Sequence, residues 1–429
     1  MNFVDWLNLI TKIIGIPSII YGLIMLTKNI YQNSRERKKI AFVNRNEKIN
    51  KVRSNSTKEN FDYYVKEYKE KLSPSYGLII SKDWVSKKEI KSIDDLELLK
   101  NVKVKVEKID TSNIEIPTLK IFPKKKLDFT QSFIQYVKPQ AQLFNGRLYA
   151  ATEVKCVNDS VEFKVYETDY YSFLNTCRVL ELMYETRERK RKLDIDILDL
   201  TNRYCGIGIN CFTVLKNVKV NKTSKLKQDY FLIHQRTNKV IESPEKIHVV
   251  PAGSYQPMTS LDKNSLEFDK DMSNTIYREF CEEILNTLHM KELNSFNLLK
   301  EDIDYKLLRK VAKIYYLGCG LEPYNTKMEV LALMVIDMDK INTIIDENEL
   351  TEFLEIHPAL NCDDKIATDL VTLKNGLKNR AGGNTEGSIL FEKLSKAMLE
   401  QYYSMENATP SAKEIFAYLY KNYDCIFLK

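Results

Sequence analysis

Four charged residues stand among apolar ones in NTIYREFCEEIL, at positions 274–285. In a helix, Glu279, Glu282 and Glu283 fall at spacings of three and four, so their side chains project from one side while apolar residues cover the other. Like charges at this spacing repel by roughly a few tenths of a kcal/mol when exposed, and by more when partly buried. The pattern therefore predicts a helix whose acidic side is either solvated or compensated by a cation.

The segment REFCEEIL resembles the helix of the Nudix box, where Arg-Glu-apolar-x-Glu-Glu follows a glycine-containing turn. The flanking order also fits, since YFLIHQR resembles the Nudix strand that ends in a basic residue and VVPAG resembles the turn that opens the box. The resemblance covers approximately residues 204–400. Five motif positions match residue for residue, namely Arg278, Glu279, Phe280, Glu282 and Glu283.

The resemblance implies chemistry with a divalent metal. In Nudix hydrolases the paired glutamates bind Mg²⁺ or Mn²⁺, which neutralises phosphate charge and lets water attack a pyrophosphate. By this resemblance Glu282 and Glu283 would be metal ligands, and Glu279 would be a further ligand or the base. Arg278 would hold a carboxylate in place. These three glutamates are the catalytic candidates if the chain is a hydrolase, and Mg²⁺ is its cofactor only in that case.

Several positions depart from the motif. Lys270 stands where the box has glutamate, Leu285 replaces its last glycine, and Asn286 replaces an apolar residue. The spacing from Gly253 to Arg278 is also longer than the motif allows. We therefore expect ligand binding to have outlasted hydrolysis. The alternative is a structural one, in which the glutamates lie in water and Arg278 forms a salt bridge.

The N-terminus carries an apolar run, WLNLITKIIGIPSIIYGLIML at positions 6–26, with Lys12 as its single charge. At about 1.5 Å per residue a helix of this length spans roughly 30 Å, the hydrocarbon thickness of a bilayer. Basic residues dominate the linker that follows, at positions 31–60, so the positive-inside rule places the rest in the cytoplasm. We expect a single-pass protein of the inner membrane. A buried core helix or an amphipathic surface helix is the alternative.

Small residues recur along the predicted membrane helix at spacings of three and four. Gly15, Ser18 and Gly22 would let two such helices approach closely, which favours self-association in the bilayer. Chance placement is the alternative.

Composition sets the domain organisation. A chain of 429 residues with 44% hydrophobic content indicates two or three structural units. The eight cysteines lack metal-binding spacing and are expected to be reduced, and the net charge of +6 does not indicate direct DNA binding. We predict an α/β (α+β) fold. Its expected parts are a transmembrane helix (1–30), a basic linker (31–60), a small α/β module (61–126) and a Nudix-like sensor domain with a mixed sheet between helices (127–429).

A nucleotide pocket needs cations for phosphates and aromatic faces for bases. Tyr315 and Tyr316 adjoin on one predicted strand, so both cannot face the same pocket. Each candidate is alternatively a packing or solvent-facing residue. The candidate ligand-binding residues are Arg236, His234, Tyr255, Arg278, Tyr316 and Arg380.

With its predicted membrane helix, the whole chain resembles the transmembrane-NUDIX effectors of antiphage defence systems built around CD-NTase enzymes. This resemblance implies a Nudix-like domain that binds a cyclic oligonucleotide, oligomerises and disrupts the inner membrane, causing cell death, with no cofactor required. One alternative is a membrane-anchored, Mg²⁺-dependent Nudix hydrolase of a nucleoside diphosphate derivative. Another is an anchored interaction scaffold without a small ligand.

Overall fold

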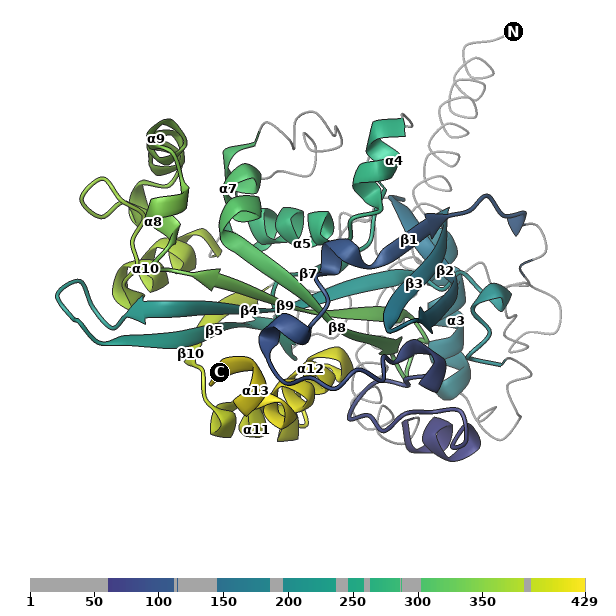
Figure 1. Cartoon of the computed structure of the whole chain (residues 1–429). Helices are drawn as coiled ribbons and strands as arrows, with labels where there is room; N and C mark the ends of the chain where they lie inside the picture. The colour runs from purple at the N-terminus through teal and green to yellow at the C-terminus, as the bar shows by residue number, and fades with distance from the viewer. Residues whose placement is uncertain are drawn as a thin grey trace, which may run out of the picture. The chain divides into compact units, whose positions relative to one another are not determined.

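The computed structural model describes residues 61–111, 114, 145–185, 196–236, 246–257, 263–285, 287, 302–381 and 387–428 (Figure 1). The predicted transmembrane helix, its seam of Gly15, Ser18 and Gly22, and the basic linker lie outside these residues. Within the part of the chain that the structure describes, no helix has the length and apolar character needed to cross a bilayer.

A seven-stranded mixed sheet forms the centre of the fold. Its order is β10-β5-β4-β9-β8, with β6 paired to β5 and β7 paired to β4. Only β4 and β9 run parallel among these pairs, while the others are antiparallel. The predicted mixed α/β fold is therefore confirmed at this level. The strands are β4 (Ile207–Lys219), β5 (Lys227–Arg236), β6 (Ile247–Val249), β7 (Ala252–Ser254), β8 (Ala312–Leu321), β9 (Met328–Asp337) and β10 (Gly387–Lys393).

Both faces of this sheet are covered. Successive residues of β4 point to opposite faces, so its buried side chains show what covers each face. Ile209 and Cys211 belong to a core cluster that includes α5, whereas Phe212 and Val214 belong to a second cluster that includes α12. Figure 1 shows the two helical layers on either side of the sheet. The first includes α4 (Lys263–Asp269), α5 (Ser273–Phe280) and α7 (Ile303–Val311), and the second includes α11 (Lys396–Ser404), α12 (Pro410–Lys421) and α13 (Tyr423–Phe427).

A second sheet has three strands in the order β1-β3-β2. Strands β2 (Arg147–Val157) and β3 (Ser160–Asp169) form a hairpin whose turn residues, Asn158 and Asp159, both have positive φ. Strand β1 (Lys103–Val106) pairs parallel with β3. The predicted boundary at residue 126 therefore lies between strands of one sheet, and the described residues all belong to one compact unit.

Backbone from the N-terminal part covers the edge of β8. Ile79 and Leu321 exchange two backbone hydrogen bonds, of 2.9 and 2.8 Å, and Tyr316 N–H donates to the carbonyl of Glu97 at 2.8 Å. These contacts satisfy groups that an edge strand would otherwise expose. The part nearest the predicted anchor is thus joined to the central sheet. Three short 3₁₀ turns accompany it, η1 (Lys82–Trp84), η2 (Ile93–Asp95) and η3 (Leu99–Asn101).

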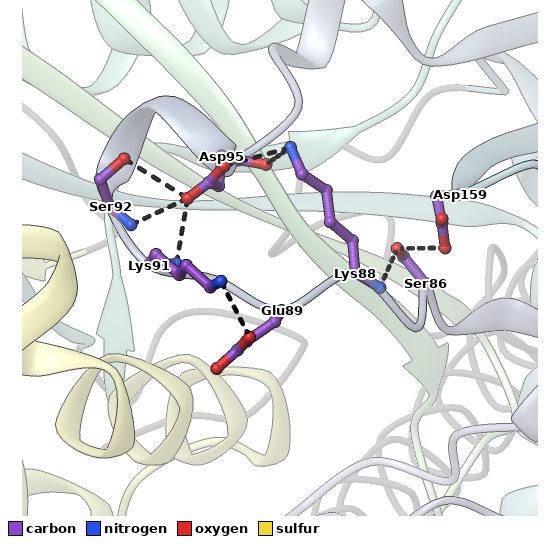
Figure 2. A network of polar contacts seen from close by, with 7 residues as sticks. All are labelled: Ser86, Lys88, Glu89, Lys91, Ser92, Asp95 and Asp159. Atoms are coloured by element: carbon purple, nitrogen blue, oxygen red, sulfur yellow. Dashed lines mark hydrogen bonds and ion pairs between the residues drawn. The ribbon is translucent and has the colours of Figure 1, made fainter.

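The loop around residue 90 is fixed by polar contacts to the β2–β3 turn (Figure 2). The carboxylate of Asp159 accepts hydrogen bonds from the Ser86 hydroxyl at 3.0 Å and from the backbone N–H of Lys87 at 3.1 Å. Asp95 accepts the backbone N–H groups of Lys91 and Ser92, both at 3.0 Å. The Lys91 hydrogen bond is the main cause that lowers the pKa of Asp95.

The remaining elements flank the two sheets. Helix α10 packs against β10 and against the end of the acidic helix, which places it beside the candidate site. These elements are α3 (Tyr170–Glu185), η6 (Leu200–Asn202), α8 (Ile341–Ile344), α9 (Glu347–Ile356), η8 (Pro358–Leu360) and α10 (Leu370–Ala381).

Candidate functional site

The predicted acidic helix is α5, and it continues into one π-helical turn, η7 (Cys281–Leu285). Ile276, Phe280 and Ile284 are buried in the core cluster on the α5 side of the sheet, as their spacing predicts. The glutamates lie on the other side. Single π-helical turns inside helices occur frequently at functional sites.

Arg278 is the cation that compensates this acidic side. Its Nη2 lies 2.8 Å from Glu279 Oε1, and its Nε lies 3.6 Å from Glu282 Oε1. Only 9% of the Arg278 side chain is exposed. Burial by itself lowers the pKa of Arg278, but Glu279 and Glu282 outweigh it and raise the pKa above its ordinary value. The counter-charge of these glutamates thus comes from Arg278, a residue of the same helix.

The short strand β7 packs against the acidic helix. Ala252 N–H donates to Glu283 Oε2 at 3.0 Å, and Nη2 of Arg278 contacts the carbonyl of Ser254 at 3.5 Å. A Cβ atom at Gly253 would overlap the carboxyl group of Glu279. A side chain at position 253 would therefore force the carboxyl end of Glu279 to shift where the PAG turn meets the helix.

These contacts decide how well Mg²⁺ would fit. Magnesium prefers several oxygen ligands in octahedral geometry. In the part of the chain described, no group of three or more His, Cys, Asp or Glu side chains is placed to hold a metal ion. A magnesium ion at Glu279 and Glu282 would lie beside the Arg278 guanidinium, so this arrangement does not fit the ion unless Arg278 moves away.

A small pocket opens beside Arg278, with a volume of about 10 Å³. Such a volume suits roughly one water molecule, whereas ligand pockets of drug size occupy about 300–1,000 Å³. A nucleotide therefore does not fit this pocket without movement of its walls. The lining residues are Tyr255, Gln256, Phe268, Asp269, Asp271, Asn274, Thr275 and Arg278.

Tyr255 lines that pocket but is mainly a packing residue. Its ring is buried, with its centroid 4.8 Å from that of Tyr149, and its hydroxyl donates to the backbone carbonyl of Asp269. Burial raises the pKa of Tyr255 well above its ordinary value. Of the predicted ligand-binding residues, Tyr255 and Arg278 are thus brought together at one pocket.

His234 and Arg236 lie at the end of β5. His234 is buried opposite His248 of β6, and burial, followed by the charge of Arg236, lowers the pKa of His234 to about 4. Arg236 is half-buried, and its Nε is shielded from water and has no hydrogen-bond partner. Among the described residues its guanidinium makes no ion pair with a carboxylate. Within the described part of the chain, this end of the sheet therefore carries a positive charge without a carboxylate partner.

His248 was not among the residues predicted from the sequence. Its Nδ1 lies 2.8 Å from Thr409 Oγ1, which also accepts the backbone N–H of Ala412 at 3.3 Å. The Thr409 hydroxyl can donate to Nδ1 or accept from it, so this contact holds the imidazole in place with either tautomer. Burial, followed by Arg236 and His234, lowers the pKa of His248 well below its ordinary value. His248 is thus a neutral donor beside Arg236.

Tyr316 lies apart from both groups. Tyr316 belongs to the core cluster on the α5 side of the sheet, and Tyr315 belongs to the cluster on the α12 side. This confirms that the two tyrosines face opposite sides. Strands β9 and β4 separate β8 from β5, so Tyr316 lies roughly 14 Å from β5 at about 4.8 Å per strand. Arg380 is part of α10, and its side chain is outside the described residues.

Comparison with profiles of known protein families gave no match. Comparison with curated proteins also gave no match. The likeness to the Nudix box therefore rests on the five motif positions and the flanking segments of the sequence.

Proposed function

We propose that this chain is a membrane-anchored receptor whose folded part binds a cyclic oligonucleotide. The observation that carries the proposal is the unequal pairing of charges in the two halves of the candidate site. Glu279 and Glu282 share the cation of Arg278, while Arg236 has no carboxylate partner in the described part of the chain. Carboxylates paired with an arginine attract a metal cation less strongly, and an unpaired arginine favours an anion.

Phosphate is the anion that this half of the site suits best. A guanidinium offers N–H groups in a fixed fork that matches phosphate oxygens, and neutral imidazoles add donors without further charge. These groups are supplied where the end of β5 pairs with β6, by Arg236, His234 and His248. A phosphodiester of a cyclic oligonucleotide carries one negative charge, which a single arginine balances.

The output of this receptor is proposed to be disruption of the inner membrane. Ligand binding would promote oligomerisation and bring the predicted helix (1–30) of neighbouring copies together at Gly15, Ser18 and Gly22, which ends in cell death. A CD-NTase enzyme would supply the ligand. The support is the apolar run at positions 6–26 and the basic residues after it.

The alternative is an anchored hydrolase that uses Mg²⁺ to cleave a nucleoside diphosphate derivative. The observation that favours it is the convergence of Glu279 and Glu283 on β7. For that chemistry Arg278 would have to release its carboxylates.

One binding experiment distinguishes the two functions. The full chain in detergent is incubated with Mg²⁺ and a panel of cyclic dinucleotides, cyclic trinucleotides and linear nucleoside diphosphate derivatives, and every species is followed by mass spectrometry. Retention of an intact cyclic species supports the receptor. Conversion of a linear diphosphate that Glu283→Gln abolishes would instead establish the hydrolase.

Two arginine variants sharpen this experiment. Arg236→Ala removes charge-assisted hydrogen bonds to phosphate and is expected to weaken retention by about 10- to 100-fold. Arg147→Ala is the control, because Arg147 lies on the other sheet and already pairs with Glu167. Equal loss in both variants would contradict a specific role for Arg236.

A further inference from the structure

Arg203 is a fully buried arginine just before β4, with 0% of the residue exposed. Its Nη atoms donate to the carbonyls of Asp199 and Ile197, each at 2.8 Å, and to the side-chain oxygen of Asn202 at 2.9 Å. All these acceptors are neutral groups. Across the residues described, Arg203 makes no ion pair with a carboxylate.

The charge of Arg203 cannot be removed by deprotonation, because a guanidinium keeps its proton in proteins. A buried charge without a counter-ion is costly, since the protein interior solvates it far less well than water does. Neutral carbonyls reduce this cost but do not cancel the charge. The site therefore lacks one negative charge.

Three shielded polar groups lie in this region, one of them on Arg203 itself. Nε of Arg203, Oγ1 of Thr326 and the hydroxyl of Tyr166 are all buried and have no hydrogen-bond partner. Nη2 of Arg203 contacts the carbonyl of Thr326 at 3.4 Å, and the charge of Arg203 acts on the pKa of Tyr166. Buried polar groups are rarely left unsatisfied, so three neighbouring ones require an explanation.

The backbone brings these groups into one region of the fold. Tyr166 of β3 pairs with Ala150 of β2, and Ala150 bridges to Gly206, three residues after Arg203. Thr326 has a φ of +57°, which β-branched residues rarely adopt. The conformation that turns Thr326 towards Arg203 is thus maintained against its intrinsic preference.

The carboxylate of Glu329, which is buried, already has partners. Glu329 of β9 lies 3.4 Å from the Nζ of Lys327 and accepts a hydrogen bond of 2.6 Å from Asn210. This pair is neutral as a whole. Glu329 thus pairs with Lys327, and no ion pair joins it to Arg203.

We propose that Arg203, Thr326 and Tyr166 form an internal binding site for one small inorganic monovalent anion of the chloride class. Such an ion accepts hydrogen bonds from several donors at once and supplies the missing charge. A water molecule could satisfy the donors but not the charge. This site is independent of the proposed nucleotide site and does not rest on it.

Thermal unfolding of the full chain in detergent tests the site through linkage, because an ion that binds only the folded state stabilises it. The unfolding midpoint is compared in sodium chloride and in sodium gluconate at equal ionic strength, since gluconate is too large for a closed site. The midpoint is expected to be higher in chloride by roughly 2–4 °C.

Variants identify the donors. Thr326→Val and Tyr166→Phe each remove one hydroxyl with little change of shape, and both are expected to reduce the chloride effect. Arg203→Met is expected to abolish it. Arg147→Met serves as the control, because this half-exposed arginine pairs with Glu167 and its loss should leave the chloride effect unchanged.

Diffraction from crystals grown in sodium bromide provides a readout that needs no variant. An anomalous bromide peak within hydrogen-bond distance of Arg203 Nε and Thr326 Oγ1 is the expected result. Equal unfolding midpoints in chloride and gluconate, together with ordinary water density and no anomalous signal beside Arg203, would overturn the proposal.

Discussion

The carboxylate of Glu414 on α12 accepts the backbone N–H of Gly77 at 2.8 Å, although 337 positions separate them in the sequence. The same oxygen, Oε2, accepts the N–H groups of Tyr76 at 2.6 Å and Leu78 at 3.4 Å. A Cβ at Gly77 would overlap the carbonyl of Pro410. One buried side chain thus fastens the N-terminal part of the described chain to α12.

Glu414→Ala is expected to destabilise the protein by about 1.5–3 kcal/mol, the range for losing hydrogen bonds to a buried charged group. Glu414→Gln keeps one acceptor oxygen and should cost less. Thermal unfolding of the full chain measures both. The exposed Glu400 on α11 provides the control Glu400→Ala, and equal losses in all three variants would contradict this role of Glu414.

Stability should fall in acid because of His234. Its pKa is lowered from 6.5 to about 4 in the folded state, so between these values the unfolded chain binds the proton more readily. The contribution of His234 is therefore present above pH 6.5 and is lost as the pH falls towards 4, at a cost of about 3 kcal/mol. The charge of Arg236 opposes its protonation as well, and His248, which pairs opposite His234, has a pKa that is itself lowered.

Unfolding by denaturant between pH 7 and pH 4 measures this effect. His234→Phe should make the decline shallower, and His248 should keep part of it. Gln235→Ala changes an exposed neighbour that does not titrate and should leave the decline unchanged. An identical pH profile for wild type and His234→Phe would rule out this contribution.

Gly253→Ala is expected to push Glu279 away from Arg278, because the added Cβ overlaps the carboxyl group of Glu279. Overpacking of this kind typically costs about 1–3 kcal/mol. Thermal unfolding and a crystal structure of the variant check both the loss and the displacement. Ser254→Ala is the matched control, since its backbone carbonyl still accepts from Arg278. A variant as stable as wild type would show that the turn adapts.

Arg278→Gln leaves Glu279 and Glu282 without their cation and should destabilise the protein by about 3 kcal/mol. The freed carboxylates should then bind Mn²⁺ more tightly than wild type does, by at least tenfold. Titration followed by the electron paramagnetic resonance of free Mn²⁺ measures this affinity. Arg147→Gln controls for the loss of one positive charge, and unchanged Mn²⁺ affinity in Arg278→Gln would contradict the argument.

Periodicity predicted those features that depend on neighbouring residues. The spacing of Ile276, Phe280 and Ile284 gave the buried side of the acidic helix, and alternation separated Tyr315 from Tyr316. These inferences succeed because a helix or strand fixes the relative directions of its own side chains.

Contacts between distant segments could not be read from the sequence in the same way. His248 approaches Thr409 only because β6 lies beside the start of α12, and Arg203 approaches Thr326 only because β4 pairs with β9. The counter-charge of the acidic helix was an intermediate case. Arg278 lies one position from Glu279 and four positions from Glu282, so the spacing in the sequence allows both ion pairs. The burial of these side chains, which favours the ion pairs over contact with water, could not be read from that spacing.

The bridge between Ile79 and Leu321 has a mechanical consequence. Together with Glu414 it attaches residues 76–79 to β8 and to α12 at once. A tension applied to the chain at Tyr76 would load these hydrogen bonds together and reach the central sheet directly. Residues 76–79 therefore transmit such a force to two elements of the fold at the same time.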